Sequence, residues 1–252
     1  MRYVALGDSY VSAPLVPVTD IANGCLRSSN NYPTLAAKAL GATLDDHSCA
    51  GARTEDLTTS QHPDVPPQLS AVKPGVDLVT IGIGGNDGGV FGQFTSRCPQ
   101  LRAQDPKGAP CEAAMSRGGR DMLLTALDTT RVKVTAALRR VHQLAPQATV
   151  LVVGYPQIIA PGDSCSKLPL AAGDYAYAAK VNQAMATMLQ RAAEATGSSY
   201  VDVFTASKGH GVCSADPWTN GSVNDQKRAA AYHPFAVEQK AVAELVVAAA
   251  KG

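Results

Sequence analysis

The chain has 252 residues, of which 45% are hydrophobic and 17% are charged, and its 22 lysine and arginine residues almost balance 21 aspartate and glutamate residues. A net charge of +1 provides no field that would attract a polyanion, so the composition disfavours a nucleic-acid partner. The longest apolar runs are too short for stable membrane insertion, and the run 241–250 is interrupted by Glu244. The length suits a single domain, 1–252, because one core stops growing efficiently at about 250 to 300 residues.

Short β-branched apolar runs alternate with longer helical patterns along the chain. The expected strands, in chain order, are 3–6, 42–46, 77–83, 149–153 and 199–204. The expected longer helices are 120–144, 174–195 and 234–250, each with apolar residues at three- and four-residue intervals. Such alternation is typical of a parallel sheet with helices on both faces. The sequence therefore predicts an α/β protein, a three-layer α/β/α sandwich with a five-stranded parallel sheet.

The first strand is followed directly by Gly7-Asp8-Ser9. In sheets of this kind ligands bind beyond the carboxyl ends of the strands, so this tripeptide is a candidate site. A sharp turn there would expose the Ser9 hydroxyl, and the N–H of Ser9, near a helix start, could face an oxyanion. On its own the tripeptide fits an ordinary turn equally well, since all three residues favour turns.

Two further strand ends carry groups that could bind negative charge. Gly51 allows its backbone to approach a ligand closely and to offer an N–H group. In the run 82–87, small residues surround Asn86, whose side-chain NH2 can donate to a developing oxyanion. Considered singly, Gly51 is more simply a loop glycine and Asn86 a cap or turn residue. The run lacks the G-x-G-x-x-G spacing of a dinucleotide-binding loop.

Of the five histidines, His233 is the best candidate for a general base. Pro234 disfavours helical geometry at His233, and it is expected to begin the last helix at its first position. A helix N-terminus would disfavour the imidazolium form and so keep His233 able to accept a proton. A surface histidine before a helix is the simpler interpretation of His-Pro alone. His47, near another strand end, is the one serious alternative base.

The six cysteines include no C-x-x-C pair, which argues against a structural zinc site and favours disulfides. They are Cys25, Cys49, Cys98, Cys111, Cys165 and Cys213. An even number of cysteines predicts an oxidising compartment and therefore a secreted protein, although fifteen pairings remain open. Nothing at the N-terminus is typical of a signal peptide, so we expect that a leader peptide was removed and that Met1 was added for expression.

Taken together, these blocks resemble the SGNH, or GDSL-type, hydrolase superfamily. The blocks are Gly7-Asp8-Ser9, Gly51, Gly85-Asn86-Asp87 and His233-Pro234, in that order. The resemblance spans 9–233 and implies a flavodoxin-like SGNH hydrolase fold. It further implies a nucleophile at Ser9, a base at His233, and an oxyanion hole made by Ser9, Gly51 and Asn86. The cysteines look like those of secreted actinobacterial lipases and esterases, which implies the pairs Cys25 with Cys49, Cys98 with Cys111, and Cys165 with Cys213.

The sequence departs from this family at the third member of the triad. Most members carry an aspartate three residues before the histidine, but that position is Ala230. Some secreted relatives look similar in holding the histidine with a main-chain carbonyl, and Ala230 or Ala231 could supply one. The sequence therefore predicts a Ser-His dyad. Three distant carboxylates remain alternatives, although we expect them to be ordinary loop or strand-end residues: Asp202, Asp216 and Asp225.

We therefore expect a serine-dependent carboxylic ester hydrolase, a GDSL-type lipase or esterase or a phospholipase, acting as a monomer on a small-molecule or lipid ester. No cofactor and no metal are expected. A carbohydrate O-acetyl esterase and a catalytically inactive binding domain of the same fold stay open as alternatives. The segment 90–120 contains Phe91, Phe94 and Leu101, which either border an acyl groove or pack as a minor core beneath a loop.

Overall fold

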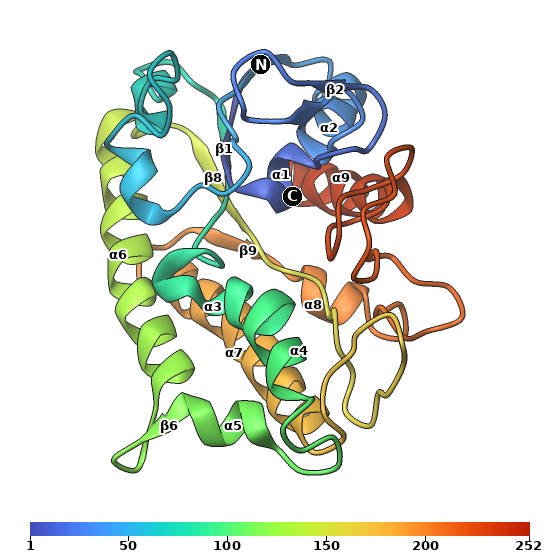
Figure 1. Cartoon of the computed structure of the whole chain (residues 1–252). Helices are drawn as coiled ribbons and strands as arrows, with labels where there is room; N and C mark the ends of the chain where they lie inside the picture. The colour runs from blue at the N-terminus through green and yellow to red at the C-terminus, as the bar shows by residue number, and fades with distance from the viewer.

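The computed structural model describes residues 1–252, and a five-stranded parallel sheet forms its centre, with the strand order β4-β1-β5-β8-β9 (Figure 1). The strands are β1 (Arg2–Gly7), β4 (Thr43–Asp46), β5 (Leu78–Gly82), β8 (Thr149–Val153) and β9 (Ser199–Val201). All four pairings in the sheet are parallel, which requires crossover connections of the kind that helices provide. The predicted α/β fold is confirmed.

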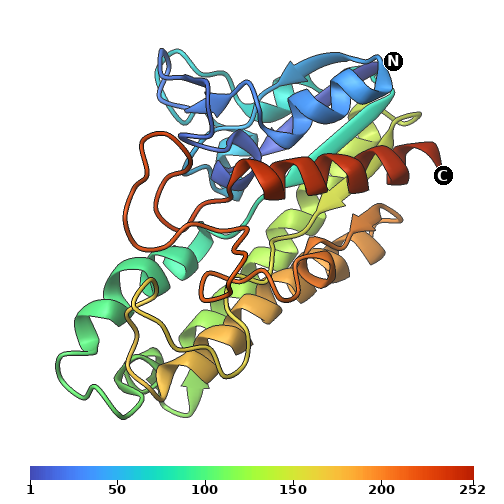
Figure 2. The same ribbon diagram turned by 90° about the vertical axis from the view of Figure 1, so that its right-hand side faces the viewer.

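Helices cover both faces of the sheet, and a separate hydrophobic core lies on each face (Figures 1 and 2). The larger core includes α6 (Met122–Leu144) and α7 (Asp174–Glu194), and the smaller core includes α2 (Tyr32–Leu40) and α9 (Ala236–Lys251). Successive side chains of a strand point to opposite faces, so in β1 Val4 and Leu6 enter the larger core while Tyr3 and Ala5 enter the smaller one. This double burial explains why the strands are almost uninterrupted apolar runs.

Short elements surround the carboxyl ends of the strands. They are α1 (Ser9–Ser12), the hairpin strands β2 (Thr19–Asp20) and β3 (Arg27–Ser28), η1 (Thr54–Leu57), η2 (Gln68–Ala71), η3 (Asp87–Gly89), α3 (Val90–Gly92), η4 (Gln93–Arg97), α4 (Cys98–Leu101), α5 (Pro110–Met115), β6 (Ser116–Arg117), β7 (Arg120–Asp121) and α8 (Val203–Ala206). None of the helices combines the length and the apolar character that spanning a membrane would require.

Three predicted boundaries are wrong by two or three residues. The helix expected from 120 begins at Met122, because Arg120 and Asp121 form β7 and the Asp121 carboxylate caps α6. The last strand ends at Val201 rather than at 204, because the Asp202 carboxylate accepts the Thr205 N–H at 2.9 Å and caps α8. The last helix begins at Ala236 rather than at Pro234, which instead forms an isolated bridge with Thr219.

Three disulfides join loops around the sheet, and their pairing is the one that the family resemblance implies: Cys25–Cys49, Cys98–Cys111 and Cys165–Cys213. The Cys25–Cys49 bond closes a sequence separation of 24 residues and attaches the β2-β3 hairpin to the loop that contains Gly51. Cross-links of this kind stabilise the fold mainly by restricting the unfolded chain.

Candidate active site

The turn after β1 presents Ser9 at the carboxyl edge of the sheet. A Cβ added to Gly7 would lie 2.4 Å from the carbonyl oxygen of Gly82, so only glycine permits the close approach of β1 and β5 here. The Asp8 carboxylate accepts the Tyr10 N–H at 2.9 Å and caps α1. Ser9 is the first residue of that helix and its N–H group has no hydrogen-bond acceptor. The Ser9 side chain is buried, and one backbone donor beside it is free.

A second free donor comes from the loop after β4. The Cys49 N–H donates to the Gly7 carbonyl at 3.0 Å, which holds this loop against the end of β1. Gly51, two residues later, has a φ of 81°, a left-handed conformation that favours glycine, and its N–H group has no acceptor. The predicted role of Gly51 as an oxyanion donor therefore has an unoccupied N–H to support it.

The third donor is the side chain of Asn86, which lines the same small cavity as Ser9. Its Nδ2 donates one proton to the carbonyl of Ala52 at 3.0 Å, which orients the amide. An amide nitrogen carries two protons, so one N–H of Asn86 remains free for a ligand. Asn86 does occupy the N-cap position of η3 (Asp87–Gly89), as the alternative interpretation allowed, but its side chain forms no capping hydrogen bond there.

Two buried carboxylates hold these loops together. Asp87 accepts hydrogen bonds from both the N–H and the hydroxyl of Thr54, and so connects the loop after β5 to the loop after β4. Asp8 accepts a hydrogen bond from the Tyr155 hydroxyl, which in turn accepts the N–H of Gly85 at 2.8 Å. Burial raises the pKa of Asp8 to about 7. The donors are thus positioned by side-chain contacts as well as by the strands.

His233 is oriented by the backbone rather than by a carboxylate. Its Nδ1 donates to the carbonyl of Ala231 at 2.7 Å, whereas the carbonyl of Ala230 accepts the His233 N–H at 3.1 Å. Because Nδ1 then carries the proton of the neutral ring, Nε2 is left as the acceptor. Burial lowers the pKa of His233, while the hydrogen bond to Ala231 acts in the opposite direction. The imidazole is therefore biased toward the neutral form that a general base needs.

The predicted reason for this neutrality was wrong. Pro234 does not begin a helix, since α9 begins two residues later and its N-cap is Phe235. The pKa of His233 is lowered by removal from water, not by a helix N-terminus.

Tyr10 connects the serine turn to the histidine segment across 222 positions of sequence. Its hydroxyl donates to the carbonyl of Tyr232 at 2.7 Å, and its ring centre lies 5.6 Å from that of His233. Phe91, which lines the cavity beside Ser9, has its ring centre 6.0 Å from His233. The structure thus brings the serine turn and the imidazole to the same rim, although no hydrogen bond joins the Ser9 hydroxyl to His233. The roles of Tyr10 and Tyr155 have no local sequence signal, whereas Asp87 belongs to the block Gly85-Asn86-Asp87.

The other candidate acids and bases have partners elsewhere. Asp202 caps α8, Asp216 lies 3.5 Å from Nδ1 of His210, and Asp225 accepts the N–H of Lys227. His47 is bonded through Nε2 to Asp45 at 2.9 Å. None of these four forms a hydrogen bond with Ser9 or His233. No group of three or more potential metal ligands is gathered in the structure.

An apolar cavity of about 30 Å³ lies next to the histidine segment. It is lined by Phe91, Phe94, Ile158, Leu168, Met185 and Tyr232, among others. Phe91 and Phe94 are two of the three residues for which the sequence leaves open an acyl groove or packing beneath a loop, and both also contact the larger core. The third, Leu101, does not line this cavity and is buried in the larger core. Aliphatic and aromatic side chains form most of the cavity wall.

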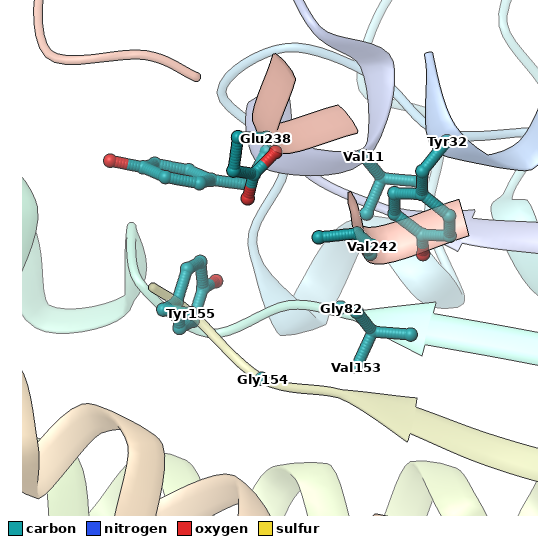
Figure 3. Close-up of a pocket in the computed structure, with 9 residues that line it drawn as sticks. Val11, Tyr32, Gly82, Val153, Gly154, Tyr155, Glu238 and Val242 are labelled. Atoms are coloured by element: carbon teal, nitrogen blue, oxygen red, sulfur yellow. The ribbon is translucent and has the colours of Figure 1, made fainter. Parts of the chain in front are cut away.

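A second buried cavity, of about 10 Å³, lies behind the serine turn and contains the carboxyl group of Glu238. In Figure 3, Glu238 and Tyr155 lie on one side of this cavity, and Tyr32 and Val242 lie on the other. Glu238 is 2% exposed, and its only hydrogen bond comes from the side-chain amide of Gln239 at 2.7 Å. Burial raises its pKa from 4.5 to about 8, so the folded protein keeps this carboxyl protonated at neutral pH.

This carboxyl should make stability depend on pH. Between pH 4.5 and about 8 the unfolded chain releases the Glu238 proton while the folded chain retains it, so the free energy of unfolding falls as pH rises through that window. Replacement Glu238→Gln should reduce this fall and raise the urea midpoint at pH 8. The exposed Glu244 of the same helix provides the control, Glu244→Gln, which should behave like the wild type. Equal slopes for Glu238→Gln and wild type would contradict the expectation.

Comparison with known proteins gives consistent similarities. The family described as GDSL-like Lipase/Acylhydrolase matches residues 5–236. Lipase 2 of Streptomyces coelicolor is 43% identical over 220 residues, 85% of this chain and 74% of that protein. The lipase of Streptomyces rimosus is 33% identical over 236 residues, 93% of this chain and 81% of that protein. Among solved structures, phospholipase A1 from Streptomyces albidoflavus has a TM-score of 0.80 with 28% identity, and covers 100% of this chain and 99% of its own. The extracellular lipase from Streptomyces rimosus has a TM-score of 0.81 with 30% identity, and the alignment covers 99% of both chains.

Proposed function

The chain belongs to the GDSL-like lipase/acylhydrolase family and is a carboxylic ester hydrolase, and we propose that it acts through Ser9 as nucleophile and His233 as general base. One observation gives this proposal its strongest support. Three hydrogen-bond donors without acceptors lie around the Ser9 turn: the N–H of Ser9, the N–H of Gly51 and one N–H of Asn86. Preorganised donors of this kind stabilise the oxyanion of acyl transfer.

The proposed reaction has two steps. Nε2 of His233 removes the proton from Ser9 as its hydroxyl oxygen attacks the ester carbonyl, and the three donors bind the resulting oxyanion. The imidazolium then returns the proton to the departing alcohol, leaving an acyl-serine. In the second step His233 deprotonates water, which attacks the acyl carbonyl, and the carboxylic acid leaves as the proton returns to Ser9.

A dyad is sufficient for this sequence of proton transfers. The Ala231 carbonyl fixes the imidazole tautomer through Nδ1, which is the orienting part of the role that an aspartate has in a triad. A neutral carbonyl stabilises the imidazolium less than a carboxylate would. A larger share of the transition-state stabilisation must therefore come from the oxyanion donors. All the named groups come from one chain, and the proposal therefore needs no partner subunit.

The proposed substrates are lipid esters. The cavity next to the histidine segment is lined mainly by hydrophobic residues, among them Phe91, Phe94 and Met185, which suits an aliphatic acyl chain better than a sugar. Relatives at 33% and 43% identity are named lipases. We also propose secretion, because disulfides form and persist mainly in oxidising compartments and a similar solved protein is described as extracellular.

The proposal is tested by covalent labelling together with a series of substrates. A fluorophosphonate should label the wild type but not Ser9→Ala, as judged by peptide mass spectrometry. Esters of increasing acyl length, phospholipids and acetylated sugars would then be compared at equal enzyme concentration. We expect faster hydrolysis of medium-chain and long-chain esters than of acetylated sugars. Preference for the acetylated sugar would indicate a carbohydrate O-acetyl esterase, and absence of labelling and of hydrolysis would indicate an inactive binding domain.

A further inference from the structure

The three most exposed large apolar side chains of the protein lie on two loops. Val18 is 73% exposed, Ile21 is 75% exposed and Val223 is 74% exposed. Single exposed aliphatic residues are common on protein surfaces and need no explanation. What distinguishes these three is their position, because both loops are fastened to the segments that carry the oxyanion donors and the base.

Val18 and Ile21 flank β2 in the hairpin that it forms with β3. The disulfide from Cys25 attaches this hairpin to the Gly51 loop, and the Ala50 N–H donates to the Cys25 carbonyl at 2.9 Å. One side of the hairpin is therefore fixed to the loop that supplies the Gly51 donor.

The second loop, 220–230, carries Val223. The adjacent Asn224 accepts the N–H of Ala231, the residue whose carbonyl orients His233, at 2.7 Å. The two loops also contact each other, because the Ala230 N–H donates to the Pro14 carbonyl at 3.1 Å. In both views the dark blue hairpin and the red loop lie side by side (Figures 1 and 2).

We propose that Val18, Ile21 and Val223 form a docking surface that inserts into the surface of an aggregated lipid substrate and so brings its esters to Ser9. This inference rests on the proposed function and adds where the lipid docks. The occupant follows from position, since the two loops meet at Pro14 and Ala230, five residues after Ser9 and three residues before His233, and an ester must reach those two groups. The charge of the two loops also bears on the kind of lipid: 13–28 and 220–230 contain two acidic residues, Asp20 and Asp225, and three basic residues, Arg27, Lys227 and Arg228, a net charge of only +1. A surface with so little net charge suits zwitterionic or neutral lipid rather than an anionic membrane.

The test uses Val18→Asp, Ile21→Asp and Val223→Asp, singly and combined, with Val132→Asp as the control. Val132 is 61% exposed but lies on α6, outside both loops. Binding to phosphatidylcholine vesicles is measured by flotation, and hydrolysis is measured on an emulsified long-chain ester and on dissolved 4-nitrophenyl acetate. We expect the triple variant to lose at least about 10-fold in vesicle binding and in emulsion hydrolysis, since three aliphatic insertions are removed and three charges face the lipid. Hydrolysis of the dissolved ester should stay within about 2-fold of wild type, and raising salt should not weaken wild-type binding.

Several results would overturn the inference. One is vesicle binding by the triple variant equal to that of wild type, and another is an equal loss in Val132→Asp. A third is a wild-type dimer that the triple variant cannot form, without vesicle binding by either, which would make this surface a protein interface. Circular dichroism and the thermal midpoint show whether each variant is folded. If the wild type binds vesicles through these residues but hydrolyses no ester, the docking surface stands while the proposed function fails.

Discussion

Replacement of Ser9 or of His233 by alanine should each reduce kcat by on the order of 10⁵-fold, and the double replacement should lose no more than either single one. The reason for this non-additivity is that the two groups perform one proton transfer: without the base the hydroxyl is a weak nucleophile, and without the hydroxyl the base has no proton to remove. The remaining activity would come from the oxyanion donors and from substrate binding. The measurement is kcat and KM on a dissolved short-chain ester, for which transport to a lipid surface does not contribute.

The controls for this prediction are the residues that the sequence leaves as alternative acids or as an alternative base: Asp202, Asp216, Asp225 and His47. Each is bonded to a group other than His233, so replacing any one of them with alanine should change kcat by less than about 5-fold. A loss at one of the three aspartates as large as in His233→Ala, in a protein that still folds, would mean that a triad operates. A loss of that size at His47 would mean that the wrong base has been assigned.

Replacement Asn86→Ala should reduce kcat by about 10²- to 10³-fold with little change in KM, which is the size of effect seen when one oxyanion donor is removed. The Asn86 amide is held by Ala52 and keeps one N–H free, so it is expected to bind the oxyanion more strongly than the carbonyl oxygen of the bound ester. An interaction that strengthens in the transition state affects kcat rather than binding of the substrate.

A matched variant distinguishes loss of the Asn86 hydrogen bond from displacement of the loop that carries Asn86. Thr54→Val removes the hydroxyl that donates to Asp87, the neighbour of Asn86, and leaves the Asn86 amide in place. This variant should lower the thermal midpoint but reduce kcat far less than Asn86→Ala. If both variants reduce kcat equally, the loss comes from displacement of the loop, and Asn86 is not the donor. A rise in KM without loss of kcat in Asn86→Ala would also contradict the assigned role.

The sheet and the order of the candidate blocks could be predicted because they depend on short-range patterns. A strand buried on both faces must be apolar at almost every position, so β1, β5 and β8 are visible as apolar runs. The blocks that contain Ser9, Gly51 and Asn86 each follow a strand, and parallel strands end at one edge. Their gathering at the rim therefore follows from the topology alone.

Boundaries and supporting contacts could not be predicted in the same way. The last strand ends early because Asp202 caps α8. The apolar residues after Asp202 look like a continued strand in the sequence, but they begin this helix instead. The hydrogen bonds of Tyr10 with Tyr232 and of Tyr155 with Asp8 join positions separated by 222 and 147 residues. No periodicity connects positions so far apart, since such contacts depend on how the helices pack on the sheet.

The amino-acid sequence by itself determined the fold class, the turn that carries Ser9 and the absence of a carboxylate from the positions just before His233, because each depends on residue type within a few positions. Only the tertiary structure decided which carbonyl binds Nδ1 of His233, and why the pKa of this imidazole is lowered. The Ala231 carbonyl is placed by a segment that Tyr10 holds from a distant part of the chain and that Asn224 holds from within the neighbouring loop, and the pKa is lowered by burial. Burial and long-range hydrogen bonds are properties of the packed chain, so they arise only when segments far apart in sequence meet.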